Sequence, residues 1–171
     1  MSLVGFKAQN HQQQVRKRGA SDKTDDRGTT PEFFDELSTR FAGFTIDVAA
    51  AAHNTKCERF YSIDDNGLEQ SWAGKRVWCN PPYSNIGAWV EKAWAERRHC
   101  PIIVMLLPAN RTEQAWWQDH VEPYRDATHE SFKFSVEFLR GRLRFIQPGE
   151  TEVLPNQRPP FGCCLLIWEA T

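Results

Sequence analysis

The sequence lacks the marks of a membrane or secreted protein. Its longest apolar runs, residues 102–107 and 163–168, are far shorter than the roughly 18 residues of a membrane-spanning helix. The opening MSLVGFKAQNHQQQ does not have the charged and then apolar layout of a signal peptide. The 5 cysteines are an odd number without the spacing of a disulfide framework. We therefore expect a cytoplasmic protein with reduced thiols and no membrane partner.

Common ligand-binding motifs are missing as well. No CxxC pair and no HExxH occurs, which argues against a metal site. Neither GxGxxG nor GxxxxGK(S/T) is present, so an ordinary dinucleotide fingerprint and a P-loop are both unsupported. An excess of positive charge is also absent, because 21 Lys and Arg stand against 22 Asp and Glu. This balance excludes a globally basic, histone-like binder, although it leaves room for a local basic groove.

What is present is enough apolar and aromatic material for one folded domain. Of the 171 residues, 40% are hydrophobic, with 7 Trp and 11 Phe among them. A chain of this length can bury roughly 70% of its unfolded surface in a single core. Residues 1–28 are polar and contain Arg16-Lys17-Arg18, which predicts a flexible segment, either a basic arm that touches a polyanion or a solubilising tail. We place the folded domain at 29–171.

The signals for secondary structure alternate between strand and helix over most of the chain. Thr30, Pro31 and Glu32 have the pattern of a capped helix start, and Thr112 is a second candidate cap. Helices are predicted at 31–37, 49–52, 85–98 and 112–120, and strands at 44–48, 57–62, 77–79, 101–107, 135–139, 142–146 and 161–168. This order predicts an α/β fold with a mixed sheet and a late antiparallel hairpin.

The most informative tetrapeptide is Asn80-Pro81-Pro82-Tyr83, which directly follows a predicted strand. Its two prolines end the strand abruptly and stiffen the turn. In an open α/β sheet, ligands bind at the carboxyl ends of the strands. The turn would therefore present a side-chain amide, a backbone carbonyl and an aromatic ring to a ligand. The alternative is a simple proline turn with a buried tyrosine.

Such a turn can activate the exocyclic amine of a nucleobase, whose lone pair is delocalised into the ring. If the side-chain oxygen of Asn80 and the carbonyl of Pro81 accept the two N–H hydrogens, the nitrogen is drawn toward tetrahedral geometry and the lone pair is localised. Tyr83 would stack on the base. The electrophile would be a methyl group on a sulfonium. Catalysis would then consist mainly of positioning and electrostatics.

The order and spacing of several short segments resemble the phage-type DNA N6-adenine methyltransferases, the phage Dam family. The segments are TPEFF at 30–34, DVAA at 47–50, NTKC at 54–57, DDNGL at 64–68, VWCNPPY at 77–83, LLPA at 106–109 and GRLRF at 141–145. The resemblance implies a Rossmann-like methyltransferase fold, a single catalytic domain at 29–171 and the cofactor S-adenosylmethionine. It also implies methyl transfer to N6 of a flipped adenine in double-stranded DNA, and protection of phage DNA from host restriction.

The resemblance further implies a set of cofactor-binding residues. They are Thr30, Pro31, Asp47, Ala49, Asp64, Asp65 and Asn80. Asp47 would face the ammonium of the methionine moiety or a ribose hydroxyl, although it is equally suited to cap a helix at Ala49. Asp64 or Asp65 would accept hydrogen bonds from the ribose or adenine, although both also fit an acidic Asn-Gly turn. Thr30 and Pro31 would pack against the methionine end, but helix capping explains them as well.

Contacts to DNA are predicted mainly for three arginines beside a predicted strand. Alternation along a strand would put Arg140, Arg142 and Arg144 on one face, where they could meet phosphates or simply be solvated. Arg111 is a further phosphate candidate. No separate target-recognition domain is visible, so any sequence specificity would come from loops such as 108–115 and 147–160. We expect a monomer.

Other functions remain open from the residues alone. The same turn can activate any planar amine or amide, which includes RNA adenine, cytosine N4 and a protein glutamine. A catalytically silent nucleic-acid-binding module with the same fold is an alternative of a different class. Cofactor binding separates the silent module from the enzymes, and identification of the methylated product separates the enzymes from one another.

Overall fold

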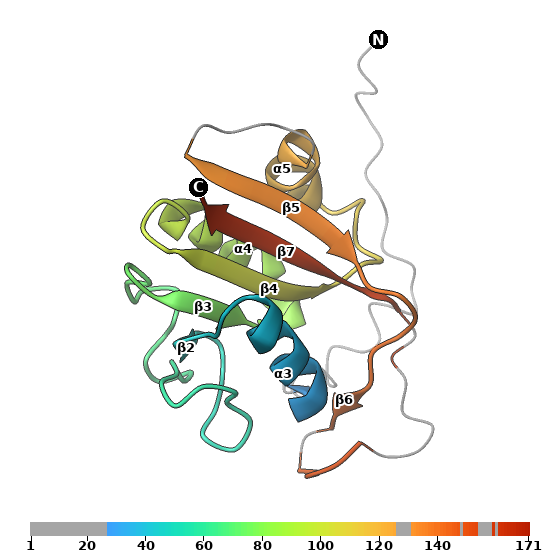
Figure 1. Cartoon of the computed structure of the whole chain (residues 1–171). Coiled ribbons are helices and arrows are strands. Elements are labelled where there is room, and N and C mark those ends of the chain that lie inside the picture. The colour runs from blue at the N-terminus through green and yellow to red at the C-terminus, as the bar shows by residue number, and fades with distance from the viewer. Residues whose placement is uncertain (1–26, 126–130, 148, 154–158, 160) are drawn as a thin grey trace.

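The computed structural model describes residues 27–125, 131–147, 149–153, 159 and 161–171. At its centre is a five-stranded sheet in the order β2-β3-β4-β7-β5 (Figure 1). The strands are β2 (Ile46–Asp47), β3 (Arg76–Cys79), β4 (Ile102–Pro108), β5 (Phe132–Phe138) and β7 (Cys163–Ala170). Strands β2, β3 and β4 run parallel, whereas β7 is antiparallel to β4 and to β5. The mixed sheet and its late antiparallel pair confirm the predicted α/β class.

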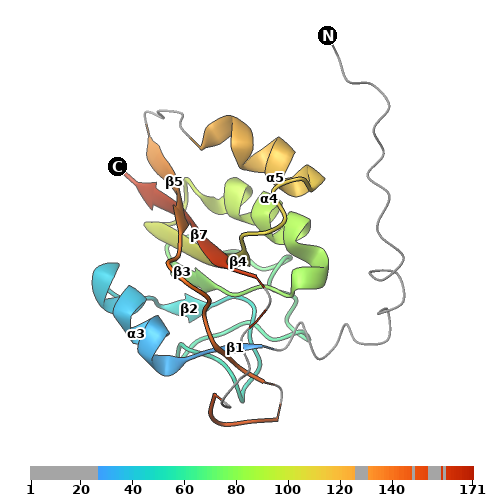
Figure 2. The same ribbon diagram turned by 90° about the vertical axis from the view of Figure 1, so that its right-hand side faces the viewer.

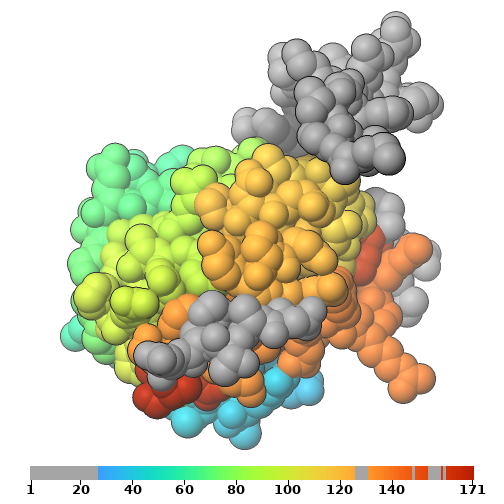
Figure 3. All heavy atoms as spheres, turned by 90° about the horizontal axis from the view of Figure 1, so that it is seen from above, coloured from blue at the N-terminus to red at the C-terminus, as the bar shows by residue number. Residues whose placement is uncertain are grey.

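Helices cover both faces of this sheet (Figure 2). Helix α3 (Pro31–Arg40) lies on one face, and α4 (Ile86–Glu96) and α5 (Ala115–His120) lie on the other, where they pack side by side (Figure 3). All seven residues of β4 are buried, and successive side chains alternate between the two hydrophobic clusters. A strand buried on both faces reads as a continuous apolar run, which is the pattern found at 102–107.

The aromatic residues are used mainly to fill these two layers. Among the fully buried side chains, the largest are tryptophans: Trp72, Trp78, Trp117 and Trp168. Phe34 of α3 packs edge-on against Trp78 of β3, with ring centroids 5.6 Å apart. Most of the Trp content therefore belongs to the core, where large rings contribute the greatest buried area.

Helix α3 begins where its sequence predicts. Thr30 is the N-cap, its hydroxyl oxygen accepts a hydrogen bond from the Phe33 amide at 3.4 Å, and Pro31 occupies the first turn. The helix continues to Arg40 rather than ending at residue 37, and Gly43 with φ of 90° then redirects the chain toward β2. The helix at 85–98 and the strands at 77–79 and 101–107 are also confirmed, as α4, β3 and β4.

The predicted helix at 49–52 is wrong, although four consecutive alanines favour a helix. The amides that would start it are bonded elsewhere: Ala49 N–H to the Asp47 carboxylate, Ala50 N–H to the Tyr61 carbonyl and Ala51 N–H to the Asn54 side chain. These bonds hold the segment as a loop. The predicted strand at 57–62 is reduced to a single parallel bridge between Asp47 and Phe60, and the strand predicted at 44–48 to Ile46–Asp47.

Two further predictions need correction. Helix α5 begins at Ala115 with Gln114 at its N-cap, so Thr112 is not the cap; its carbonyl accepts a hydrogen bond from the Gln118 side chain. The strand predicted at 142–146 is present only as β6 (Phe145–Ile146). It pairs antiparallel with β1 (Gly28–Thr29), in a second, two-stranded sheet. The connection from β5 to β7 is therefore a long excursion to β1 and not a tight hairpin.

The predicted flexible segment 1–28 lies largely outside the described residues. Its last two positions, Arg27 and Gly28, are described, and Gly28 belongs to β1. Within the part of the chain that the structure describes, no helix is long and apolar enough to cross a membrane.

Candidate active site

The turn Asn80-Pro81-Pro82-Tyr83 leaves the carboxyl end of β3, next to the carboxyl end of β2. The amide nitrogen of the Asn80 side chain donates a hydrogen bond to the Arg27 carbonyl, with Nδ2 and O 2.9 Å apart. No described residue donates to the Oδ1 atom of Asn80. The short 3-10 helix η1 (Tyr83–Asn85) follows, and its first bond runs from the Asn85 amide to the Pro82 carbonyl, which leaves the Pro81 carbonyl outside the turn. Neither the Asn80 Oδ1 atom nor the Pro81 carbonyl is thus engaged by the hydrogen bonds described for this turn.

Tyr83 is buried in this structure, with only 6% of its surface exposed. Its ring packs edge-on against Phe161 at a centroid distance of 6.0 Å, and its hydroxyl has no hydrogen-bond partner in the part of the chain that the structure describes. Burial raises the pKa of the Tyr83 hydroxyl far above its usual value, so the group stays protonated. The guanidinium of Arg111 donates to the Tyr83 carbonyl at 2.8 Å. No ring face is free for a base here, and stacking on Tyr83 stays a prediction.

Asp47, at the end of β2, is the one buried carboxylate among the described residues. Its oxygens accept hydrogen bonds from the amides of Ala49 and Lys56, at 3.4 and 3.2 Å. Burial raises the pKa of Asp47 to about 6, and the two amides and the Lys56 charge oppose that rise. Asp47 therefore ties together the two ends of the loop 48–56.

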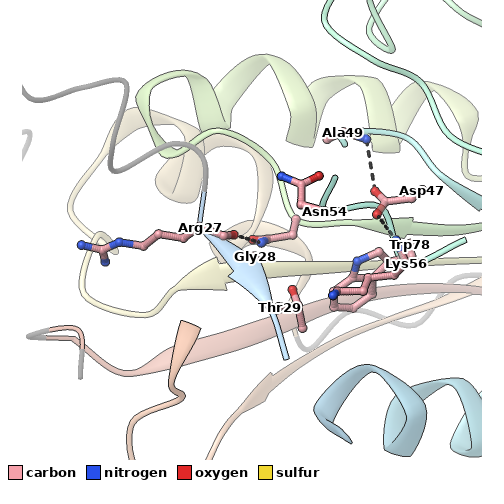
Figure 4. Close-up of a pocket in the computed structure, with 9 residues that line it drawn as sticks. Arg27, Gly28, Thr29, Asp47, Ala49, Asn54, Lys56 and Trp78 are labelled. Carbon is pink, nitrogen blue, oxygen red and sulfur yellow. Dashed lines mark hydrogen bonds between the residues drawn. The ribbon is translucent and has the colours of Figure 1, made fainter. Parts of the chain in front are cut away.

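A small polar cavity lies between this carboxylate and Asn80 (Figure 4). Its volume is about 20 Å³, which is room for one water molecule. In Figure 4, Asp47 lies between Ala49 and Lys56, and β1 brings Gly28 and Thr29 in from the other side. The Thr29 hydroxyl and the Trp78 indole nitrogen, both from lining residues, are buried without a hydrogen-bond partner among the described residues. Unpaired buried polar groups of this kind are costly, and they mark a place where a polar ligand or water would be stabilised.

A larger cavity of about 600 Å³ opens beside the small one. Its lining comes from the loop after β2, from five residues between 61 and 67, from Pro82 and Ser84 after β3 and from Trp89 of α4. Asn54 and Ala49 line both cavities. A third cavity of about 230 Å³ shares Gly28, Asn54 and Lys56 with the small one and includes Pro31 and residues 146, 147 and 149–151. Asn54 therefore lines all three cavities.

The structure brings together some of the predicted site residues and separates others. Asp47, Ala49 and Asn80 line the small cavity. Neither Asp64 nor Asp65 lines any of these three cavities; the Asp65 carboxylate accepts hydrogen bonds from the amide and the hydroxyl of Ser62, which lower its pKa. Their roles toward ribose or adenine stay predictions. The neighbours Ser62, Ile63 and Asn66 line the large cavity instead.

Several lining residues carry no sequence signal of their own. They are Arg27, Thr29, His53, Asn54, Lys56 and Trp78. Asn54 and Lys56 fall in the segment at 54–57, and Trp78 falls in the segment at 77–83, both of which carry the family resemblance, whereas Arg27, Thr29 and His53 fall in none of these segments. Thr30, in contrast, caps α3 and does not line the described cavities, whereas its neighbour Thr29 does.

The basic residues are exposed, but not as one face of a strand. Arg140, Arg142 and Arg144 all lie in the connection before β6, where Gly141 has a φ of 77°. The alternation that would align all three is therefore absent. Arg144 directly precedes Phe145, which pairs with Thr29, so the segment runs beside the small cavity.

Residues 18–171 match the family model "DNA N-6-adenine-methyltransferase (Dam)". The chain therefore belongs to the DNA N-6-adenine-methyltransferase (Dam) family, which confirms the resemblance noted in the sequence. The match includes both β1 and the Asn80-to-Tyr83 turn.

Individual relatives match over parts of their length. The chain is 39% identical over 100 residues to the DNA N-6-adenine-methyltransferase of Escherichia phage T1, covering 57% of this chain and 42% of that protein. It is 40% identical over 65 residues to the DNA N-6-adenine-methyltransferase of Haemophilus phage HP1, covering 37% and 38%. The matches thus span less than half of either phage protein.

Among solved structures, a "putative RNA methyltransferase" from Pyrococcus horikoshii aligns with a TM-score of 0.47 and 9% identity, over 82% of this chain and 83% of that one.

Proposed function

We propose that this chain transfers a methyl group from S-adenosylmethionine to the N6 amino group of adenine in DNA. The observation that carries the proposal is the Asn80 side chain, whose Nδ2 is bonded to the Arg27 carbonyl. This bond uses the donor of the side-chain amide and leaves Oδ1 as an acceptor at the carboxyl end of β3. Together with the Pro81 carbonyl, it can take both N–H hydrogens of a planar amine and localise the nitrogen lone pair.

The residues present fit the proposed cofactor. The cavity of about 600 Å³ is large enough for a nucleoside, and the adjoining polar cavity offers a buried carboxylate, an unpaired hydroxyl and an unpaired indole N–H. The small cavity has room for one water-sized group, and Asp47 would hold the ammonium group there. When bound, S-adenosylmethionine supplies a methyl group on a sulfonium; the carbon–sulfur bond breaks as the nitrogen–carbon bond forms, and the amine loses one proton to water.

The decisive experiment uses labelled methyl transfer to unmethylated DNA and RNA, followed by nucleoside identification. N6-methyladenine in DNA is the expected product. Detection of methylated RNA adenine, N4-methylcytosine or a methylated protein amide as the product would instead show that the proposed substrate is wrong. No transfer, combined with no heat of binding at millimolar S-adenosylmethionine, would favour a silent binding module.

The pKa of Asp47 predicts that cofactor affinity depends on pH. Because the pKa is about 6 in the free protein, the carboxylate is mostly neutral at pH 5 and ionised at pH 7. If the ionised form holds an ammonium group, the Kd for S-adenosylmethionine should fall about tenfold between pH 5 and pH 7. Calorimetry at both pH values measures this, and Asp47→Asn should flatten the dependence. An equally steep profile in Asp47→Asn would contradict the assignment.

The raised pKa of Asp47 also makes the stability of the free protein depend on pH, in the direction opposite to that of cofactor affinity. The folded state holds this proton more tightly than the unfolded state, so the free energy of unfolding receives its full contribution from Asp47 below about pH 4 and loses it as the pH rises through 6. Denaturant melts of the wild type minus those of Asp47→Asn isolate this contribution. A difference that does not change between pH 4 and pH 6 would show that Asp47 is not buried as described.

DNA binding is expected to depend on the exposed arginines before β6. Arg142→Ala should weaken DNA binding and reduce the slope of log Kd against log salt by about one phosphate contact. Arg98→Ala is the matched control, because Arg98 is also exposed and lies beyond the far end of α4. If the salt dependence of DNA binding is the same in Arg142→Ala as in the control, the segment before β6 does not contact DNA phosphates.

A further inference from the structure

Arg111 is the residue whose position in the structure departs most from its expected role. The sequence suggests a phosphate contact, but the Nη1 atom of Arg111 donates to the Tyr83 carbonyl at 2.8 Å. Arg111 is half-buried, and no ion pair to an acid is found for it among the described residues. Its charge is directed at a backbone oxygen in the catalytic turn. Charge-assisted hydrogen bonds of this kind are about twice as strong as neutral ones.

The sheet topology explains why these two segments meet. Strands β3 and β4 are parallel neighbours, with Cys79 paired to Met105, so the chain leaves both strands at the same edge. The catalytic turn follows β3, and the loop carrying Arg111 follows β4. Residues 28 positions apart in the chain are thus brought within hydrogen-bond distance. A local sequence pattern cannot predict this contact, because the two residues are far apart in the chain.

The loop that carries Arg111 is itself held at both ends. The Ala109 amide donates to the Gly162 carbonyl at 2.8 Å, which fixes the loop to the start of β7. The Arg111 carbonyl accepts from the Gln114 amide at 3.2 Å, just before α5. Arg111 therefore presents its guanidinium from a fixed backbone and not from a free surface loop.

The turn needs such support on this side. Its first residue is held through the Asn80 side chain, which bonds to the Arg27 carbonyl. Pro81 and Pro82 have no amide hydrogen and so cannot bond the turn to its surroundings through their nitrogens. The bond from Arg111 to Tyr83 holds the other end. An error of 1 Å in the placement of reacting groups can cost on the order of a hundredfold in rate.

We propose that Arg111 is a positioning residue, which fixes the Asn80-to-Tyr83 turn through the Tyr83 carbonyl and does not contact DNA phosphate. This role rests on the proposed function, in which that turn binds the target amine. Arg111 touches no reacting atom in this assignment. Its loss should therefore affect the rate of methyl transfer and leave the electrostatics of DNA binding unchanged.

The test compares Arg111→Ala and Arg111→Lys with the control Arg98→Ala, after melting temperatures have shown that each variant is folded. We expect kcat of Arg111→Ala to fall roughly 10- to 100-fold, with the KM for DNA and the salt slope of DNA binding both unchanged. Arg111→Lys keeps a charged donor and should recover most of the lost rate. Amide exchange at residues 83–87 should be faster in Arg111→Ala than in the wild type.

A phosphate contact gives a different pattern. If Arg111→Ala has a raised KM, a salt slope smaller by about one and an unchanged kcat at saturating DNA, the positioning role is overturned. A variant that keeps its full kcat would overturn it as well. Should Arg111→Ala not fold, the same comparison is made on Arg111→Lys and Arg111→Gln, of which only the lysine variant keeps a charged donor. Absence of methyl transfer by the wild type would reject the proposed function itself.

Discussion

The Asn80→Ala variant is expected to lose methyl transfer, with a fall in kcat of roughly 10²- to 10³-fold, the range seen when one such polar contact to a transition state is removed. The physical reason is that alanine supplies no acceptor for the target amine. The Asn80 side chain also bonds to the Arg27 carbonyl and lines the small cavity, but the larger cavity proposed for the nucleoside does not include it. The Kd for S-adenosylmethionine should therefore stay within a few-fold of the wild type. Single-turnover kinetics and calorimetry measure the two quantities.

Two further substitutions sharpen this result. Asn85→Ala makes the same chemical change at an exposed position of η1 whose side chain makes no capping hydrogen bond, and it should keep its activity. Asn80→Asp keeps an oxygen acceptor but replaces the donor Nδ2, so a carboxylate oxygen would face the Arg27 carbonyl. We expect it to be much less active than the wild type. Full activity of Asn80→Ala would sink the mechanism.

The Gly67→Ala variant is expected to be the most damaging single-methyl change near the site. A Cβ at this position would lie 2.1 Å from the Val48 carbonyl oxygen and 3.1 Å from the Trp89 ring. Since Val48, Gly67 and Trp89 all line the large cavity, the clash would force two of its walls apart. Overpacking of this kind costs about 1–3 kcal/mol of unfolding free energy. The Kd for the cofactor should rise roughly tenfold or more, because a loss of about 1.4 kcal/mol of binding free energy raises the Kd tenfold.

The matched control is Gly87→Ala in α4. The nearest atom to a Cβ there is the Trp116 Cβ at 3.4 Å, an ordinary contact distance, and alanine favours a helix by about 1 kcal/mol over glycine. Gly87→Ala should therefore be neutral or stabilising, with unchanged cofactor binding. Urea melts and calorimetry on both variants provide the comparison. If Gly67→Ala binds the cofactor as the wild type does, the large cavity is not the cofactor site.

The elements that local sequence predicts well are those whose stabilising contacts are also local. Thr30 and Pro31 start α3 because the cap and the first turn lie within four residues. Strand β4 is recognisable because seven consecutive buried residues need an apolar side chain on both faces. The prolines after Asn80 mark the end of β3 for the same reason, since proline cannot continue a central strand.

The errors occur where distant groups take over backbone hydrogen bonds. Alanines 49–52 have high helix propensity, but Asp47, Asn54 and Tyr61 hold the amides of Ala49, Ala51 and Ala50 in a loop. Propensity differences are well below 1 kcal/mol per residue, so such bonds can outweigh them. Residues 142–146 were expected to extend a hairpin, but β6 pairs with β1, more than 110 positions earlier in the chain.

The sequence by itself determined the α/β class, the position of the Asn80-to-Tyr83 turn after a central strand and the family, because these depend on short segments in a definite order. Only the tertiary structure decided what surrounds Asn80: the Arg27 carbonyl that orients its amide, the unpaired Thr29 and Trp78 groups beside Asp47, and the Arg111 guanidinium on Tyr83. Each of these contacts joins residues on different strands or loops. Their proximity follows from the order of strands in the sheet, and the spacing of residues along the chain does not predict it.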